Sequence, residues 1–264
     1  MADTTFKLNA AGRIALVTID DGEDYTRPTT LGRSAFESAV HVLEELERGD
    51  WEAAVFTGKP FVFCVGADID EFGKVEDPRE GIRAGHGLFN RIRELPFPTV
   101  AAINGAALGG GLELALHCTA RTLASNVRHI GFPEVFLSII PGWGGTQLLP
   151  KLVGPDAAAK VIVLNPLRQN TLLKAQEAFE LGIVVEFHRR RVVFLSKHVH
   201  RALRAIARFV ASGAAEFDDQ PTAAFGKQVH IFRMQVHRFH VFDQPVARER
   251  LGAPVHAVLA GLAG

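Results

Sequence analysis

The chain has little cysteine, no net charge and no long uninterrupted apolar run, and each of these features argues against one class of protein. Its two cysteines, Cys64 and Cys118, are too few for a disulfide framework and lack the spacing of a zinc site. Lys and Arg number 29, as do Asp and Glu, so no bulk positive field favours nucleic acid. The most apolar stretch, residues 100–116, is broken by Asn104 and glycines, and residues 1–10 hold no apolar export core. We therefore expect a cytoplasmic protein without a membrane span.

Charge is distributed unevenly along the chain. From His188 onward, 12 Lys and Arg stand against 5 Asp and Glu, which leaves 17 against 24 in the residues before it. This shift predicts a boundary between a core, residues 1–187, and a C-terminal region of atypical composition, residues 188–264. Basic clusters are usually solvated faces, and no RNA-binding motif accompanies these, so nucleic acid is not the expected partner.

Hydrophobic patterning indicates strands that alternate with helices. Short β-branched and aromatic runs alternate with longer segments whose apolar residues recur at helical spacing. The expected strands are residues 14–19, 53–57, 61–65 and 99–103, and the expected helices are residues 34–46, 86–95 and 112–118. This order predicts an α/β layered domain.

Three consecutive glycines, Gly109 to Gly111, follow the run at 99–103 and precede a helix that carries Glu113. Free N–H groups and the positive end of the helix dipole face outward at such a place, and glycine lets a ligand approach the main chain. The segment therefore either binds an anion or oxyanion, or is a tight turn that needs small residues for packing. Phosphate-loop and dinucleotide motifs have different spacings and do not fit.

Three motifs in order give the chain its resemblance to a known family. They are GADIDE at residues 66–71, NGAALGGGLE at 104–113 and PEVFLSIIPGWGGT at 133–146. The chain resembles the crotonase (enoyl-CoA hydratase/isomerase) superfamily from about Ile14 to Ile183. Within that superfamily, its sequence is most similar to the hydratase modules of bacterial multifunctional fatty-acid-oxidation enzymes. One departure is Ser138, which stands where the third motif often has glycine.

The resemblance implies a role for each matching position. Glu113 and Glu134 match the family's two catalytic glutamates, and the amides of Ala67 and Gly110 match its oxyanion hole. Gly142 matches a glycine that helps to place the water. The positions that match coenzyme A contacts are Arg27, Pro28, Val65, Ala67, Asp68 and Ile69. We add Trp143 as a residue that shapes the acyl pocket, with plain core packing as the alternative.

The resemblance also implies a fold, a reaction and an assembly. The expected fold is the crotonase-like spiral of ββα repeats with a helical C-terminal region, assembled as a homotrimer or a dimer of trimers. The expected reaction adds water to a 2-trans-enoyl-CoA and gives a 3-hydroxyacyl-CoA. It needs no metal and no cofactor beyond the coenzyme A of the substrate. The alternatives are an enoyl-CoA isomerase or acyl-CoA hydrolase of the same family, and a catalytically silent protein that binds acyl-CoA or RNA.

The remaining reactive side chains have structural interpretations. Cys64 and Cys118 lie in apolar segments and are expected to be buried, not nucleophilic. His117 and His129 have no spaced metal-ligand partners, so we expect both to be structural histidines.

Overall fold

The computed structural model describes residues 3–72, 77–184 and 186–187 of the chain. The predicted boundary after residue 187, and the helical region expected at 188–264, lie outside the described residues. Within the described part, no helix is long and apolar enough to cross a membrane.

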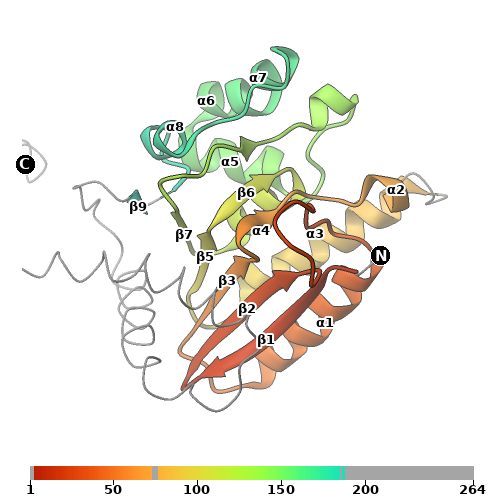
Figure 1. Cartoon of the computed structure of the whole chain (residues 1–264), viewed down its shortest axis with the longest axis vertical. Coiled ribbons are helices and arrows are strands. Elements are labelled where there is room, and N and C mark those ends of the chain that lie inside the picture. Colours follow the sequence, from red (N-terminus) through yellow and green to blue (C-terminus); the bar gives the residue numbers. More distant parts are fainter. Residues whose placement is uncertain (1–2, 73–76, 185, 188–264) are drawn as a thin grey trace, which may run out of the picture.

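Among the described residues, nine strands form two sheets, most of which can be followed in Figure 1. The larger sheet has the order β1-β2-β3-β5-β7-β9, in which only the β1–β2 pairing is antiparallel. Its strands are β1 (Thr5–Ala11), β2 (Ile14–Asp20), β3 (Ala53–Gly58), β5 (Thr99–Ile103), β7 (Ala120–Leu123) and β9 (Glu186–Phe187). The smaller sheet is parallel and has the order β4 (Phe61–Cys64), β6 (Gly105–Leu108) and β8 (Ile130–Gly131).

The chain alternates between the two sheets. Each of the pairs β3–β4, β5–β6 and β7–β8 places its first strand in the larger sheet and its second in the smaller one, and helical segments follow each pair. The expected spiral of ββα repeats is therefore present. The predicted strands at 53–57 and 61–65 are also present, but they belong to different sheets and do not pair with each other.

Helical segments follow each strand pair and complete the spiral. They are α1 (Arg33–Arg48), α2 (Ile69–Phe72), α3 (Pro78–Glu94), α4 (Gly110–His117), η1 (Glu134–Leu137), α5 (Gly145–Val153), α6 (Pro155–Ala159), η2 (Lys160–Leu164), α7 (Asn165–Leu167) and α8 (Ala175–Glu180). The helix predicted at 86–95 begins eight residues earlier, at Pro78, because Asp77 caps it and accepts a hydrogen bond from the Arg79 amide.

Helix α1 packs along β1 and against α3, as Figure 1 shows from one side. The side chains that meet between these elements are large and apolar, and they include Phe6, Val42, Phe56, Phe89 and Ile92. Strand β2 is buried along its first six residues, as expected for a strand covered on both faces. This packing gives the spiral a rigid base on which the loops after the strands are held.

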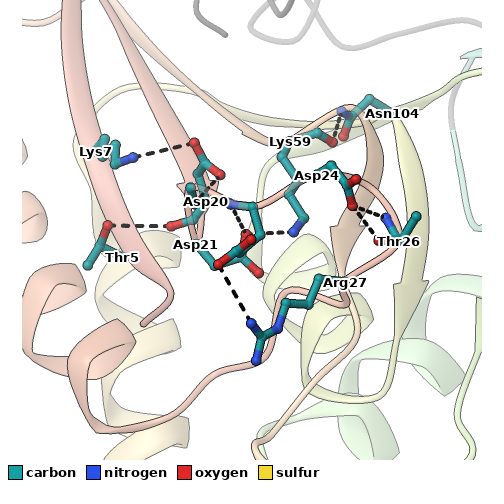
Figure 2. A network of polar contacts seen from close by, with 11 residues as sticks. Thr5, Lys7, Asp20, Asp21, Asp24, Thr26, Arg27, Lys59 and Asn104 are labelled. Atoms are coloured by element: carbon teal, nitrogen blue, oxygen red, sulfur yellow. Dashed lines mark hydrogen bonds and ion pairs between the residues drawn. The ribbon is translucent and has the colours of Figure 1, made fainter. Parts of the chain in front are cut away.

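A buried ion pair joins two of these loops (Figure 2). The Lys59 ammonium lies 2.5 Å from Oδ1 of Asp21, and the two side chains are 2% and 4% exposed. The Asn104 side chain donates hydrogen bonds to the carbonyls of Gly58 and Lys59, at 2.9 and 2.8 Å, and so fixes the turn that carries Lys59. The pair therefore anchors the loop that follows β2, the loop that contains Arg27 and Pro28.

We expect Lys59→Met to destabilise the protein strongly, because it leaves the Asp21 carboxylate buried without its partner. The expected loss is about 3–5 kcal/mol in the free energy of unfolding, measured by urea denaturation. The control is Asp50→Asn, which breaks the exposed Asp50–Arg13 pair and should change stability by less than about 1 kcal/mol. Equal effects of the two substitutions would contradict this account.

Candidate active site

The loop of residues 65–71 lies beside the segment 29–33, and five hydrogen bonds join the two. Two of them pair Leu31 with the neighbours of Ala67: the Leu31 amide donates to the Gly66 carbonyl at 2.8 Å, and the Asp68 amide donates to the Leu31 carbonyl at 3.2 Å. In a parallel bridge of this kind, the N–H of Ala67 itself points away from Leu31. The other three bonds are Val65 N–H to the Thr29 carbonyl at 3.0 Å, Thr30 Oγ1 to Asp68 Oδ2 at 3.1 Å, and Arg33 N–H to Glu71 Oε2 at 2.6 Å.

The glycine turn at the start of α4 lies against Gly66, the residue before Ala67. A Cβ atom on Gly66 would be 3.0 Å from the nitrogen of Gly110, so the main chains of the two loops are in contact. Neither the Ala67 nor the Gly110 amide donates a hydrogen bond to another described residue. Two neighbouring N–H groups are therefore available to a ligand, as an oxyanion hole requires.

Glu113 lies in the first turn of α4, and its carboxylate is held by two backbone amides. Its Oε1 accepts hydrogen bonds from the amides of Trp143 and Gly145, at 2.8 and 2.7 Å, while the residue is only 2% exposed. Burial raises the pKa of Glu113 to about 7, against the opposing effect of the Gly145 and Trp143 amides, which stabilise the charged form. A base with a pKa near neutrality suits proton transfer at physiological pH.

Glu134, the first residue of η1, follows Pro133 and is 8% exposed. Its Oε2 is buried and has no hydrogen-bond partner among the described residues. Its Oε1 lies 2.8 Å from the position that a Cβ atom on Gly109 would take, so only glycine leaves room for this carboxyl. Burial raises the pKa of Glu134 to about 8; its own backbone amide opposes this rise, and the charge of Glu113 adds to it. Because its Oε2 has no donor, Glu134 retains its proton more readily than Glu113, whose carboxylate accepts two amide hydrogen bonds.

The structure brings most of the predicted site residues together, but not all of them. The Trp143 amide bonds to Glu113, and the Glu134 carboxyl lies beside Gly109. Gly110 lies against the residue before Ala67, and Ala67 lines the same cavity as Trp143. Gly142 is half-buried against Ile82, and its amide bonds to neither glutamate; the amides that reach Glu113 belong to Trp143 and Gly145.

The predicted coenzyme A positions lie along the outer side of this site. Ile69 is 65% exposed and Pro28 is exposed, while Val65, Ala67 and Asp68 are half-buried. The Arg27 guanidinium is half-buried and lies 3.6 Å from the Glu23 carboxylate. Asp68 is turned toward its own loop: its Oδ1 accepts from the amides of Asp70 and Glu71, so its carboxylate organises the loop.

Sequence reasoning missed the residues that hold the Ala67 loop. Thr30 and Glu71 were given no role, although Glu71 is the last residue of the GADIDE motif. Their partners, Asp68 and Arg33, are 38 residues away in each case, so no local pattern could have paired them. Gly145 also lies in a recognised motif, yet its amide bond to Glu113 is visible only in the structure.

Cys64 and Cys118 are buried, as expected; His117 is also buried, whereas His129 is exposed. Burial raises the pKa of the Cys64 and Cys118 thiols to about 12, which opposes a nucleophilic role. Burial also lowers the pKa of His117 to about 4, and its Nδ1 lies 2.9 Å from the Glu113 carbonyl, one turn behind the site. Among the described residues, no group of three His, Cys, Asp or Glu side chains is arranged to hold a metal ion.

A comparison with family models matches residues 10–238 to the family described as Enoyl-CoA hydratase/isomerase. This match extends beyond residue 183, where the resemblance of the motifs ends. Two curated relatives, both called fatty acid oxidation complex subunit alpha, are 40% identical over 180 residues. The protein from Idiomarina loihiensis is matched over 66% of this chain and 24% of its own length, and the protein from Aliivibrio fischeri over 65% and 25%. The chain thus spans about a quarter of the length of these relatives.

Solved structures share the fold. DspI of Pseudomonas aeruginosa superposes with a TM-score of 0.63 at 28% identity, over 92% of this chain and 98% of that one. An enoyl-CoA hydratase from Bacillus anthracis superposes with a TM-score of 0.61 at 27% identity, over 88% and 90% of the two chains.

The raised pKa of Glu134 predicts a pH-dependent penalty on stability. The folded protein holds a proton up to about pH 8, whereas the unfolded chain releases it near the ordinary value of 4.5. Stability should therefore fall as pH rises from about 5 to about 8. Glu134→Gln removes this effect, so its melting temperature should exceed that of the parent by more at pH 9 than at pH 5. The titration of His117 is common to both proteins and cancels in the difference; a difference that does not change with pH would contradict the assignment.

Proposed function

The chain belongs to the enoyl-CoA hydratase/isomerase family, and from this we propose that it adds water to 2-trans-enoyl-CoA thioesters and gives 3-hydroxyacyl-CoA. The observation that carries the proposal is the pair of buried glutamates: two amides hold Glu113, and Glu134 has a buried oxygen without a partner. Two carboxyl groups of unequal proton affinity can take a proton from water and deliver another to carbon.

In the proposed reaction, the thioester oxygen accepts hydrogen bonds from the Ala67 and Gly110 amides. These amides stabilise the negative charge that grows on the oxygen as the enolate forms, and such a donor is typically worth roughly 10²–10³ in rate. Both amides are already in place and need no reorganisation when the charge develops. This is the step for which the anchored Ala67 loop and the glycine turn are suited.

The two glutamates then have separate tasks. The Glu113 carboxylate takes a proton from water as the water oxygen bonds to C3, and the Glu134 carboxylic acid gives its proton to C2. Glu113 ends protonated and Glu134 ionised, and transfer of one proton from Glu113 to Glu134 restores the starting state. The sum is one water added across the double bond. No electrons are transferred, so the proposal includes no redox cofactor, and coenzyme A enters only as part of the substrate.

Further properties follow from the family and stay predictions. A homotrimer or dimer of trimers, a cytoplasmic location, the coenzyme A contacts of residues 27–28 and 65–69, and the water-placing role of Gly142 are proposed on resemblance alone. The names of the curated relatives support fatty acid oxidation as the setting, since both are called subunits of a fatty acid oxidation complex.

We expect the purified protein to remove the conjugated-enoyl absorbance of crotonyl-CoA. Glu134→Gln should lower kcat by about 10²–10⁴-fold, because the variant has no proton to give to C2, with little change in affinity for the thioester. The matched control is Glu94→Gln, which neutralises an exposed glutamate at the end of α3 and should leave kcat unchanged.

Other outcomes of this assay would identify the alternatives. Binding of the thioester without any turnover would show a silent acyl-CoA-binding protein. Conversion of 3-enoyl-CoA without hydration would show an isomerase, and release of free coenzyme A would show a hydrolase. Each of these results would contradict the proposed hydration.

A further inference from the structure

A cavity of about 560 Å³ lies between α1, α3 and the loop that contains Ala67. Its volume lies in the range of small-molecule sites. Its wall is mainly apolar, with Leu31, Phe36, Ala84 and Trp143, and the charged residues Arg33, Asp68 and Glu71 also line it. Because Ala67 offers its amide to the thioester oxygen and Trp143 holds Glu113 through its own amide, this cavity adjoins the reacting carbons.

Trp143 forms the inner wall of this cavity. It is 5% exposed, and its indole lies edge-to-face against Phe36, with ring centroids 5.4 Å apart, and against Phe89, at 5.5 Å. Phe36 lines the cavity, whereas Phe89 belongs to the core. The indole therefore separates the cavity from the space between α3 and α4.

The indole fits between two glycines, one from each of these helices. A Cβ atom on Gly85 of α3 would lie 2.3 Å from the indole nitrogen, and one on Gly110 of α4 would lie 2.3 Å from the far ring. The indole N–H donates to the Gly81 carbonyl at 3.2 Å, which fixes the ring in this position. Removing the ring would leave a space between the two glycines that continues the cavity inward.

We propose that the indole of Trp143 limits the length of the acyl chain, so that the protein selects short 2-enoyl thioesters. This inference rests on the proposed function, because it takes the cavity to hold the acyl chain. Because the acyl chain meets the indole, its later carbons must turn along the exposed part of the wall that includes Ala84, where they gain little in binding. The main-chain amide of Trp143 holds the Glu113 carboxylate, and its side chain limits the depth of the pocket. One residue therefore determines both the position of Glu113 and the depth of the pocket.

The test measures binding of two saturated thioesters, butanoyl-CoA and decanoyl-CoA, by calorimetry. Saturated chains cannot be hydrated, so the readout is independent of hydratase activity. Trp143→Ala should lower the ratio of the decanoyl Kd to the butanoyl Kd by at least about tenfold, since one methylene in an apolar pocket is typically worth 10-fold or more. Trp143→Phe is a smaller change and should shift the ratio in the same direction. It keeps the test valid if the alanine variant does not fold.

Two further variants make the test specific. Ala84→Leu adds bulk at an exposed position of the same wall and should raise the ratio, the opposite shift to Trp143→Ala. Phe89→Leu loosens the packing on the core side of the indole without lining the cavity, and it should leave the ratio unchanged although it lowers the melting temperature.

The results separate this inference from the proposed function. If both thioesters bind and the Trp143 and Ala84 variants keep the ratio of the parent, the role of Trp143 is wrong while the family function stands. If Phe89→Leu shifts the ratio as much as Trp143→Phe, general loosening of the core explains the effect and the inference is wrong. If neither thioester binds the parent protein, both proposals fail.

Discussion

A carboxylate inside a protein needs hydrogen-bond donors in place of the water that it has lost. Glu113 obtains two of them from the main chain of one segment, residues 143–145. These bonds hold one carboxylate oxygen in place, and burial keeps the pKa of the group close to neutrality. Glu134 lacks such donors at its Oε2 and is more strongly inclined to keep its proton. The two glutamates therefore differ in the amides that surround them, and the charge of Glu113 adds to the difference.

The same constraint explains why glycines gather at the site. Main-chain amides can face a ligand or a carboxylate only where side chains do not intervene. Gly66 and Gly110 let two loops touch, Gly109 leaves room for the Glu134 carboxyl, and Gly85 with Gly110 accommodates the indole of Trp143. Close approach of the backbone thus occurs three times: at the proposed oxyanion hole, at the proposed proton donor and at the wall of the cavity.

The elements that carry the site were largely predictable from sequence, while the contacts within it were not. The strand at 99–103 and the helix at 34–46 were found within two residues, because their apolar residues recur at the period of their structure. Strand β6 was missed because its first three residues, 105–107, are Gly and Ala and show no hydrophobic alternation, and its conformation depends on pairing with β4 and β8. The bonds from Thr30 and Arg33 to the Ala67 loop join distant segments, which a single sequence cannot pair.

The central claim, that the Ala67 and Gly110 amides polarise a thioester carbonyl, can be measured directly. Infrared difference spectroscopy of crotonyl-CoA, carrying ¹³C at its carbonyl and bound to the slow Glu134→Gln variant, reports the strength of hydrogen bonding to that oxygen. We predict that the carbonyl stretch lies at a lower frequency than in water. Adding Thr30→Val, which removes one bond that holds the Ala67 loop, should reduce the shift. A bound carbonyl that vibrates at its frequency in water would contradict the account.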